Sequence, residues 1–263
     1  MHGDERIEGG LTAAELDRYS WQRSVAGFGD EGQHRLRSAA VLVSRVGGVG
    51  GAAATYLAAA GVGRLVLAHA GNLRRNDLNR QTLMSTSGIG RPRVEQAAAR
   101  LRDLNPHVVV ETVAENATAD NSARLVAGCD LVVGAAPLFA ERLLLNAEAV
   151  RQRRPLVDAA MYDAEARLMS VLPGGACLAC LYPAPPPHWR REFPVLGAVA
   201  GVAGTLAALE AIKILTGCGT PLAGRLWTCD TATMTCRTIT IPARRECPVC
   251  GPRATGSVAT MDD

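Results

Sequence analysis

The feature that most constrains the fold is the stretch AAVLVSRVGGVGGAAATYLAAAGVGRLVLAHAG, residues 39–71. A short β-branched run, a glycine-rich turn, an alanine-rich helical segment and a second apolar run follow one another, and this order predicts a β–α–β unit of the nucleotide-binding type. Two residues depart from that use. Arg45 stands where the turn needs its first glycine, and His69 ends the second strand where an acidic residue would hold a ribose.

The rest of the first half continues the alternation of helix and strand. Helical patterns cover residues 13–37, 91–106, 121–128 and 139–154, and strand patterns cover residues 107–115, 130–136 and 155–162. Strands that are separated by helices are joined by right-handed crossovers. We therefore predict an α/β fold, a Rossmann-like and mostly parallel sheet with helices on both faces.

In the second half, apolar and polar residues alternate along three segments, as they do in half-buried antiparallel strands. These segments are 166–174, 224–230 and 234–242, and between the first two lie a proline-rich loop and a long glycine–alanine helix. We expect this half to extend the sheet with antiparallel strands.

Two CxxC pairs stand out among the cysteines, Cys177 with Cys180 and Cys247 with Cys250. Two such pairs predict a tetrahedral Zn(Cys)4 site with Zn–S bonds of about 2.3 Å, and four protein ligands make the zinc structural. A redox CxxC or four buried thiols is the alternative. The other four cysteines lie in or beside predicted elements and are expected to be core thiols: Cys129, Cys218, Cys229 and Cys236.

These patterns divide the chain into four parts. They are an N-terminal helical segment (1–38), a Rossmann-like half of the nucleotide-binding type (39–163), a half with antiparallel strands, crossover loop, long helix and zinc site (164–251), and a disordered tail (252–263).

Composition excludes several kinds of partner. The net charge is +3 over 263 residues, and no basic run with interleaved aromatics occurs, so we expect no nucleic-acid partner. The N-terminal residues lack the pattern of a signal peptide. The apolar segment 193–217 is broken by glycines and carries Glu210 and Lys213, so no apolar run is expected to reach the roughly 18 residues that span a bilayer. We expect a buried helix, no membrane contact and a cytoplasmic protein.

Several motifs together resemble one family. RYSWQRSVAGFGDEGQHRLRSAAVLV, GGVG, AGVGRLVL, NDLNRQTL, IGRPRVEQA, NPHVVVE, both CxxC pairs and ALEAIKILTG occur in this order. The chain resembles the ThiF/MoeB family, relatives of ubiquitin-activating enzymes, from Arg18 to Gly251. The resemblance implies a homodimer with a tetracysteine zinc. It also implies adenylation of the C-terminal Gly-Gly of a ubiquitin-like sulfur carrier with ATP and Mg²⁺.

The residues of the family's glycine turn and ribose site are only partly present. Its GxGGxG turn reads Arg45, Val46, Gly47, Gly48, Val49 and Gly50 here. The Arg45 side chain would either occupy the nucleotide space or neutralise a phosphate. The family's ribose-binding aspartate falls on His69, whose neutral imidazole cannot accept two hydroxyl groups as a carboxylate does. A second acidic position falls on Gly71.

The charged groups of the family also differ. Its phosphate-binding lysine falls on Arg93, its metal-binding aspartate on Pro137, and one catalytic arginine on Trp21. These replacements argue against an ordinary ATP and Mg²⁺ site. Arg80 is retained, and the resemblance implies that it reaches into the active site of the other subunit as an arginine finger. Capping a turn at the dimer interface is an equal alternative for Arg80.

Three functions follow as hypotheses. The favoured one is a pseudoenzyme-like protein that dimerises with itself or with an intact relative, binds the C-terminus of a carrier protein or peptide, and lends Arg80 in trans. A second is an enzyme whose remodelled pocket uses Arg45, His69 and Arg93 for an anionic ligand. A third is residual adenylation with weakly bound ATP.

Overall fold

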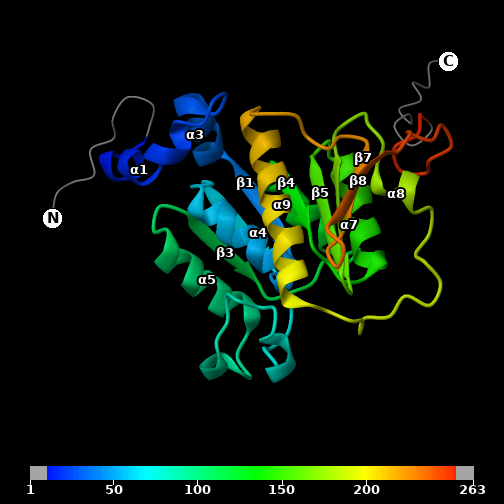
Figure 1. Cartoon of the computed structure of the whole chain (residues 1–263), viewed down its shortest axis with the longest axis horizontal. Coiled ribbons are helices and arrows are strands. Elements are labelled where there is room, and N and C mark those ends of the chain that lie inside the picture. Colours follow the sequence, from blue (N-terminus) through cyan, green and yellow to red (C-terminus); the bar gives the residue numbers. More distant parts are fainter. Residues whose placement is uncertain (1–10, 253–263) are drawn as a thin grey trace, which may run out of the picture.

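The computed structural model describes residues 11–252. Its centre is an eight-stranded sheet in the order β3-β2-β1-β4-β5-β6-β7-β8 (Figure 1). The parallel strands are β1 (Ala40–Ser44), β2 (Arg64–Ala68), β3 (Val109–Val113), β4 (Leu131–Gly134) and β5 (Leu156–Tyr162). The antiparallel strands are β6 (Glu165–Val171), β7 (Arg225–Asp230) and β8 (Thr235–Thr240). The predicted mixed α/β architecture is confirmed.

Helices cover both faces of the sheet because the buried strands are apolar on both sides. Val41 and Val43 of β1 pack in one apolar cluster with α4 (Gly48–Ala59), α5 (Arg93–Leu104) and α9 (Gly197–Thr216). Leu42, between them, packs in a second cluster with α6 (Ser122–Ala127), α7 (Phe139–Arg151) and α8 (Leu178–Leu181). Figure 1 shows α9 beside α4 on one side of the sheet. This alternation is what a strand buried on both faces requires.

The N-terminal residues 13–37 are helical as predicted, but they form three separate helices. The segment forms α1 (Ala13–Arg18), α2 (Ser20–Arg23) and α3 (Gly29–Ser38). Gly27 and Gly29 adopt φ of 79° and 55°, which no helix continues through. The predicted disordered tail begins at Pro252 and otherwise lies outside the described residues, together with residues 1–10.

Helix α9 corrects the expectation about bilayer-spanning length. By length and composition it could cross a membrane, with a mean hydropathy of 1.7 over an 18-residue window. In the structure 44% of that window is buried, and α9 packs against α4 and the sheet. Glu210 and Lys213 form an ion pair within the helix, and Glu210 also accepts hydrogen bonds from Ser170 and the Leu222 N–H. The helix is therefore a core element of this fold.

Two of the expected core thiols are instead a disulfide. Cys229 of β7 and Cys236 of β8 stand opposite each other in the strand register, with Cα atoms 4.0 Å apart. The two sulfurs are bonded. Cys129 is buried as expected, whereas Cys218 is partly exposed.

Candidate functional site

A pocket of about 430 Å³ lies at the carboxyl ends of β1, β2 and β4, where the strand order changes direction. Ligands of open α/β sheets bind at this point of the topology. Five of the proposed pocket residues line it together with Arg80: Arg45, Gly47, Gly48, His69 and Arg93. Gly50 does not line it. A Cβ on Gly50 would lie 2.4 Å from the carbonyl oxygen of Arg45, so this glycine permits close packing of the turn.

Arg45 is held by a carboxylate from another element. It adopts φ of 66° at the end of β1, and its Nε donates to Glu141 Oε2 at 2.8 Å. The Ser44 hydroxyl donates to the same carboxylate at 2.9 Å. Glu141 stands on α7 and is buried, as is Arg45. The arginine at the first turn position therefore has its charge paired within the chain.

His69 is a neutral group on the pocket floor. It follows β2, and its N–H donates to the Val113 carbonyl at 3.0 Å, which fixes its backbone. Burial, with the nearby charges of Arg45, Arg93 and Arg191, lowers the pKa of His69 to about 3. Its Nδ1 is buried and makes no hydrogen bond within residues 11–252. At the position where the resemblance implies a ribose-binding carboxylate, the structure therefore has a neutral imidazole with an unpaired nitrogen.

Asp77 joins two of the pocket arginines, a role that the sequence did not indicate. Its carboxylate lies 2.6 Å from Arg93 Nη2 and 3.1 Å from Arg80 Nη2. Burial alone would raise the pKa of Asp77, but hydrogen bonds from Arg93 and the Arg74 N–H lower it below its usual value. Both oxygens of the carboxylate are thereby used.

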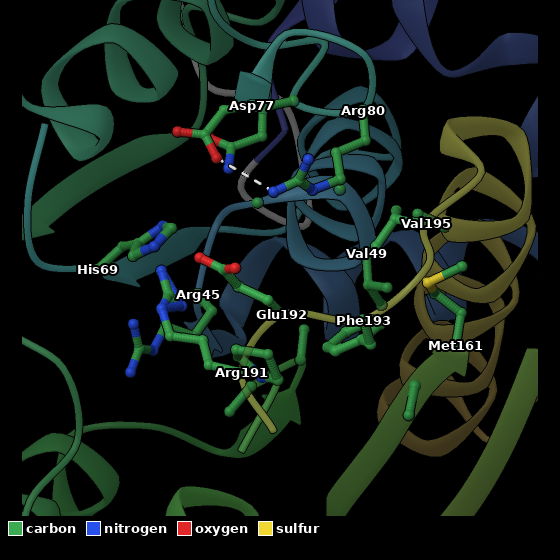
Figure 2. A pocket seen from close by; sticks show the side chains of 18 of the residues that line it. Arg45, Val49, His69, Asp77, Arg80, Met161, Arg191, Glu192, Phe193 and Val195 are labelled. Carbon is green, nitrogen blue, oxygen red and sulfur yellow. Dashed lines mark hydrogen bonds and ion pairs between the residues drawn. The ribbon is translucent and has the colours of Figure 1, made fainter. Parts of the chain in front are cut away.

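Arg80 caps a turn in the single chain. Its Nη1 donates to the Asn76 carbonyl and to Asn79 Oδ1, both at 2.8 Å, and its Nη2 faces Asp77 (Figure 2). The Arg80 side chain is 27% exposed. These contacts are those of the turn-capping alternative, and the role in a second subunit stays a prediction.

The implied metal position is covered by an aromatic side chain. Trp189 Nε1 donates to the Pro137 carbonyl at 2.7 Å, and its ring packs edge-on against Phe139 at 5.0 Å. Trp189 belongs to the segment between α8 and α9, residues 182–196, which we call the crossover segment. This bond therefore connects the crossover segment to the loop that follows β4. Trp21, in the place of a catalytic arginine, is 90% exposed on α2 and does not line the pocket.

The crossover segment also brings two charged residues to the pocket, Arg191 and Glu192. Neither makes an ion pair or a hydrogen bond in the part of the chain that the structure describes. Figure 2 shows the Glu192 carboxylate pointing into the pocket, between His69 and Arg80. The sequence analysis missed both residues because the proline-rich loop gave no element on which to place them.

The four CxxC cysteines come together as the sequence predicts. Their Sγ atoms all lie within 4.8 Å of one another, although one pair adjoins α8 and the other lies near the C-terminus. Asn146 of α7 accepts the Leu178 N–H at 2.8 Å and so orients the first knuckle. Four sulfur ligands in a closed cluster suit a soft or borderline metal ion such as zinc. The donor set therefore fits a metal ion.

A family model described as "ThiF family" matches residues 19–249. The chain belongs to the ThiF family. Its similarity to "Protein HesA, vegetative" of Trichormus variabilis is 49% identity over 92% of this chain and 91% of that protein. The "SAMP-activating enzyme E1" of Haloferax volcanii is 40% identical over 96% of this chain and 95% of its own length.

Solved structures of E. coli MccB share the fold. MccB with MccA-N7isoASN superposes with a TM-score of 0.80 at 21% identity, over 93% of this chain and 76% of MccB. Another structure of MccB contains ATP. This ThiF-family chain therefore has the fold of MccB.

Proposed function

We propose that this ThiF-family protein binds the C-terminal carboxylate of a carrier protein or peptide and does not adenylate it. The observation that carries the proposal is the charge of the pocket. Six arginines line it, and four of them are ion-paired with Glu141, Asp77 or Asp158. Arg74 and Arg191 have no carboxylate partner in the described part of the chain and remain for a ligand. Arginine suits a carboxylate ligand because its planar N–H groups match the two oxygens.

The chemistry of adenylation needs groups that this pocket lacks. A magnesium-bound triphosphate requires an oxygen ligand for the metal, and the position that the resemblance implies for it holds Pro137. The position implied for the ribose carboxylate holds His69. Removing one preorganised charge-stabilising group typically costs about 10²–10³ in rate. Several such losses at one site leave binding as the better supported activity.

A dimer is part of the proposal. Several apolar side chains on and beside α4 and α9 are exposed in the single chain: Tyr56, Leu196, Val202 and Leu209. Exposed apolar groups that gather on neighbouring helices favour a protein interface. Either a second copy or an intact relative would cover them, and Arg80 would then be available to the partner's pocket. Zinc bound by the cysteine cluster would be structural.

Titration calorimetry of the whole protein tests the proposal. A peptide with a free C-terminal carboxylate is expected to bind, whereas ATP, ADP and AMP with or without Mg²⁺ are expected to bind no tighter than about 100 μM. The matched control is the same peptide with an amidated C-terminus. Tight binding of ATP·Mg would overturn the proposal, and so would equal binding of the free and amidated peptides.

Adenylation is the second candidate, favoured by the similarity to the SAMP-activating enzyme E1 of Haloferax volcanii and by the unpaired Glu192 carboxylate in the pocket. In this case Glu192 takes the place of a missing acidic ligand. Pyrophosphate exchange in the presence of a carrier with a Gly-Gly terminus measures this activity. Exchange that Glu192→Gln abolishes would establish the second candidate over the first.

A further inference from the structure

The pocket has two chemically different halves (Figure 2). On one side lie the charged and polar groups already described, with His69 and Arg45 at the floor and Arg191 at the rim. On the other side, α4, β5 and the crossover segment supply an apolar wall of Val49, Met161, Phe193 and Val195. A ligand that fills both halves must itself carry a charged end next to an apolar group.

In the polar half, unused hydrogen-bonding atoms are gathered. His69 Nδ1, Gln81 Oε1 and Arg93 Nε are buried without a partner in residues 11–252, and all three residues line this pocket. Buried polar atoms are nearly always hydrogen-bonded, so these three atoms are candidate partners for the polar groups of a ligand. Arg191 adds a cation without a partner carboxylate at the same rim.

The side chains of the apolar half are held in place by packing. Met161 is 6% exposed, and Phe193 and Val195 are half-buried, so these side chains are held in the apolar cluster that includes Ala200 and Val199. Phe193 is also fixed by ring contacts to Tyr162 at 5.8 Å and Trp189 at 5.6 Å. A Gly-Gly terminus offers no side chain to this wall and would leave its apolar surface in contact with water.

Glu192 opposes an anionic ligand. Its carboxylate points into the polar half from the crossover segment, yet no arginine of the described chain pairs with it. A ligand carboxylate that enters the pocket meets this like charge and must displace it. Loss of the Glu192 charge should therefore strengthen the binding of an anionic ligand, whereas loss of Arg191 should weaken it.

We infer that the pocket selects a polypeptide C-terminus whose last residue has an apolar side chain of about valine or leucine size. The terminal carboxylate lies on Arg191 and the free Nε of Arg93. The last peptide N–H donates to His69 Nδ1, and the side chain packs on Val49, Met161, Phe193 and Val195. This inference rests on the proposed function and adds the identity of the terminal residue.

Four synthetic octapeptides test it by calorimetry with the whole protein. They share their first seven residues, which end in glycine, and their last residue is glycine, valine, leucine or leucine amide. One or two methylenes in an apolar pocket discriminate by about 10–200-fold. We expect the leucine peptide to bind at least about tenfold tighter than the glycine peptide. The peptide that ends in leucine amide should bind much more weakly than the leucine peptide.

Single substitutions test which residues form the polar half and the apolar half of the pocket. Arg191→Ala should lower the affinity for the leucine peptide by about tenfold or more, and Glu192→Gln should raise it. The neighbouring Arg190→Ala is the matched control, because Arg190 is exposed and does not line the pocket. Val195→Thr, which keeps the shape but adds a hydroxyl, should reduce the preference for leucine over glycine.

The outcomes separate the inference from the proposed function. Binding that needs the free carboxylate but shows no preference for valine or leucine overturns the inference and leaves the proposed function standing. Equal affinities of the free and amidated leucine peptides overturn both. Unchanged binding in Arg191→Ala, or an equal loss in Arg190→Ala, overturns the placement of the carboxylate.

Discussion

The ion pair between Arg45 and Glu141 gives the sharpest test of how the altered turn is stabilised. Arg45 is 9% exposed and Glu141 is 6% exposed, so removal of one partner leaves the other charge buried without its counterion. Breaking such a buried pair costs about 3–5 kcal/mol. Glu141→Ala should therefore lower the free energy of unfolding by about 3–5 kcal/mol.

The companion change at Arg45 has a second effect. Arg45→Gly strands the Glu141 carboxylate, but glycine also relieves the left-handed backbone at φ of 66°. The strain of such a non-glycine residue is about 1–3 kcal/mol. The net loss should thus be smaller than that of Glu141→Ala. The double variant removes both charges, so it should be more stable than Glu141→Ala, with a coupling energy of about 2–3 kcal/mol.

Urea unfolding, followed by circular dichroism and by tryptophan fluorescence, measures the four free energies. The exposed pair of Arg64 and Glu111 provides the control, and Glu111→Gln should cost less than about 1 kcal/mol. Single-variant losses that simply add in the double variant, within about 0.5 kcal/mol, would refute the reasoning. Arg45 would then be free to act on a ligand.

Three further predictions concern other parts of the molecule. His69 should remain neutral from pH 5 to 8 in NMR spectra of its imidazole. Because its pKa of about 3 in the folded protein lies below the value of about 6.5 in the unfolded chain, His69 should lower the free energy of unfolding progressively as the pH falls below about 6.5. His69→Asn should remove that pH dependence. Metal analysis should find about one zinc per chain. Cys250→Ser should lose the metal, whereas Cys236→Ser, which changes a disulfide cysteine, should retain it. Equal metal content in the two variants would contradict the assignment. Trp189→Phe removes the hydrogen bond to the Pro137 carbonyl, and proteolysis of the crossover segment should become faster by several-fold; unchanged cleavage would mean that this bond does not hold the segment.

The order of the elements could be predicted because apolar periodicity is a local signal. The strands and helices from residue 39 to residue 171 stand close to their predicted places, and the pocket lies where the glycine turn and the end of β2 indicated. The metal site could also be predicted, because the two cysteines of each CxxC pair are close in sequence and can bind one ion together. The fold then brings the two pairs to the same place. The division of residues 13–37 into three helices was not indicated: Tyr19 separates α1 from α2, and Gly27, with φ of 79°, lies between α2 and α3.

Partners of the pocket arginines could not be predicted, because pairing depends on tertiary placement. Glu141 follows Arg45 by 96 residues, and nothing in the sequence around either one indicates the other. Asp77 lies in the NDLNRQTL motif, but its use by both Arg80 and Arg93 appears only when the turn is folded. The Cys229–Cys236 bond likewise depends on the register of β7 and β8.

The pairing of Arg45 with Glu141 also limits how the turn could be changed. A chain with glycine at position 45 alone would bury an unpaired acid, and a chain that lacks only the acid would bury an unpaired base. Either single change gives a less stable protein, so a GxGGxG turn is better tolerated when both positions change together.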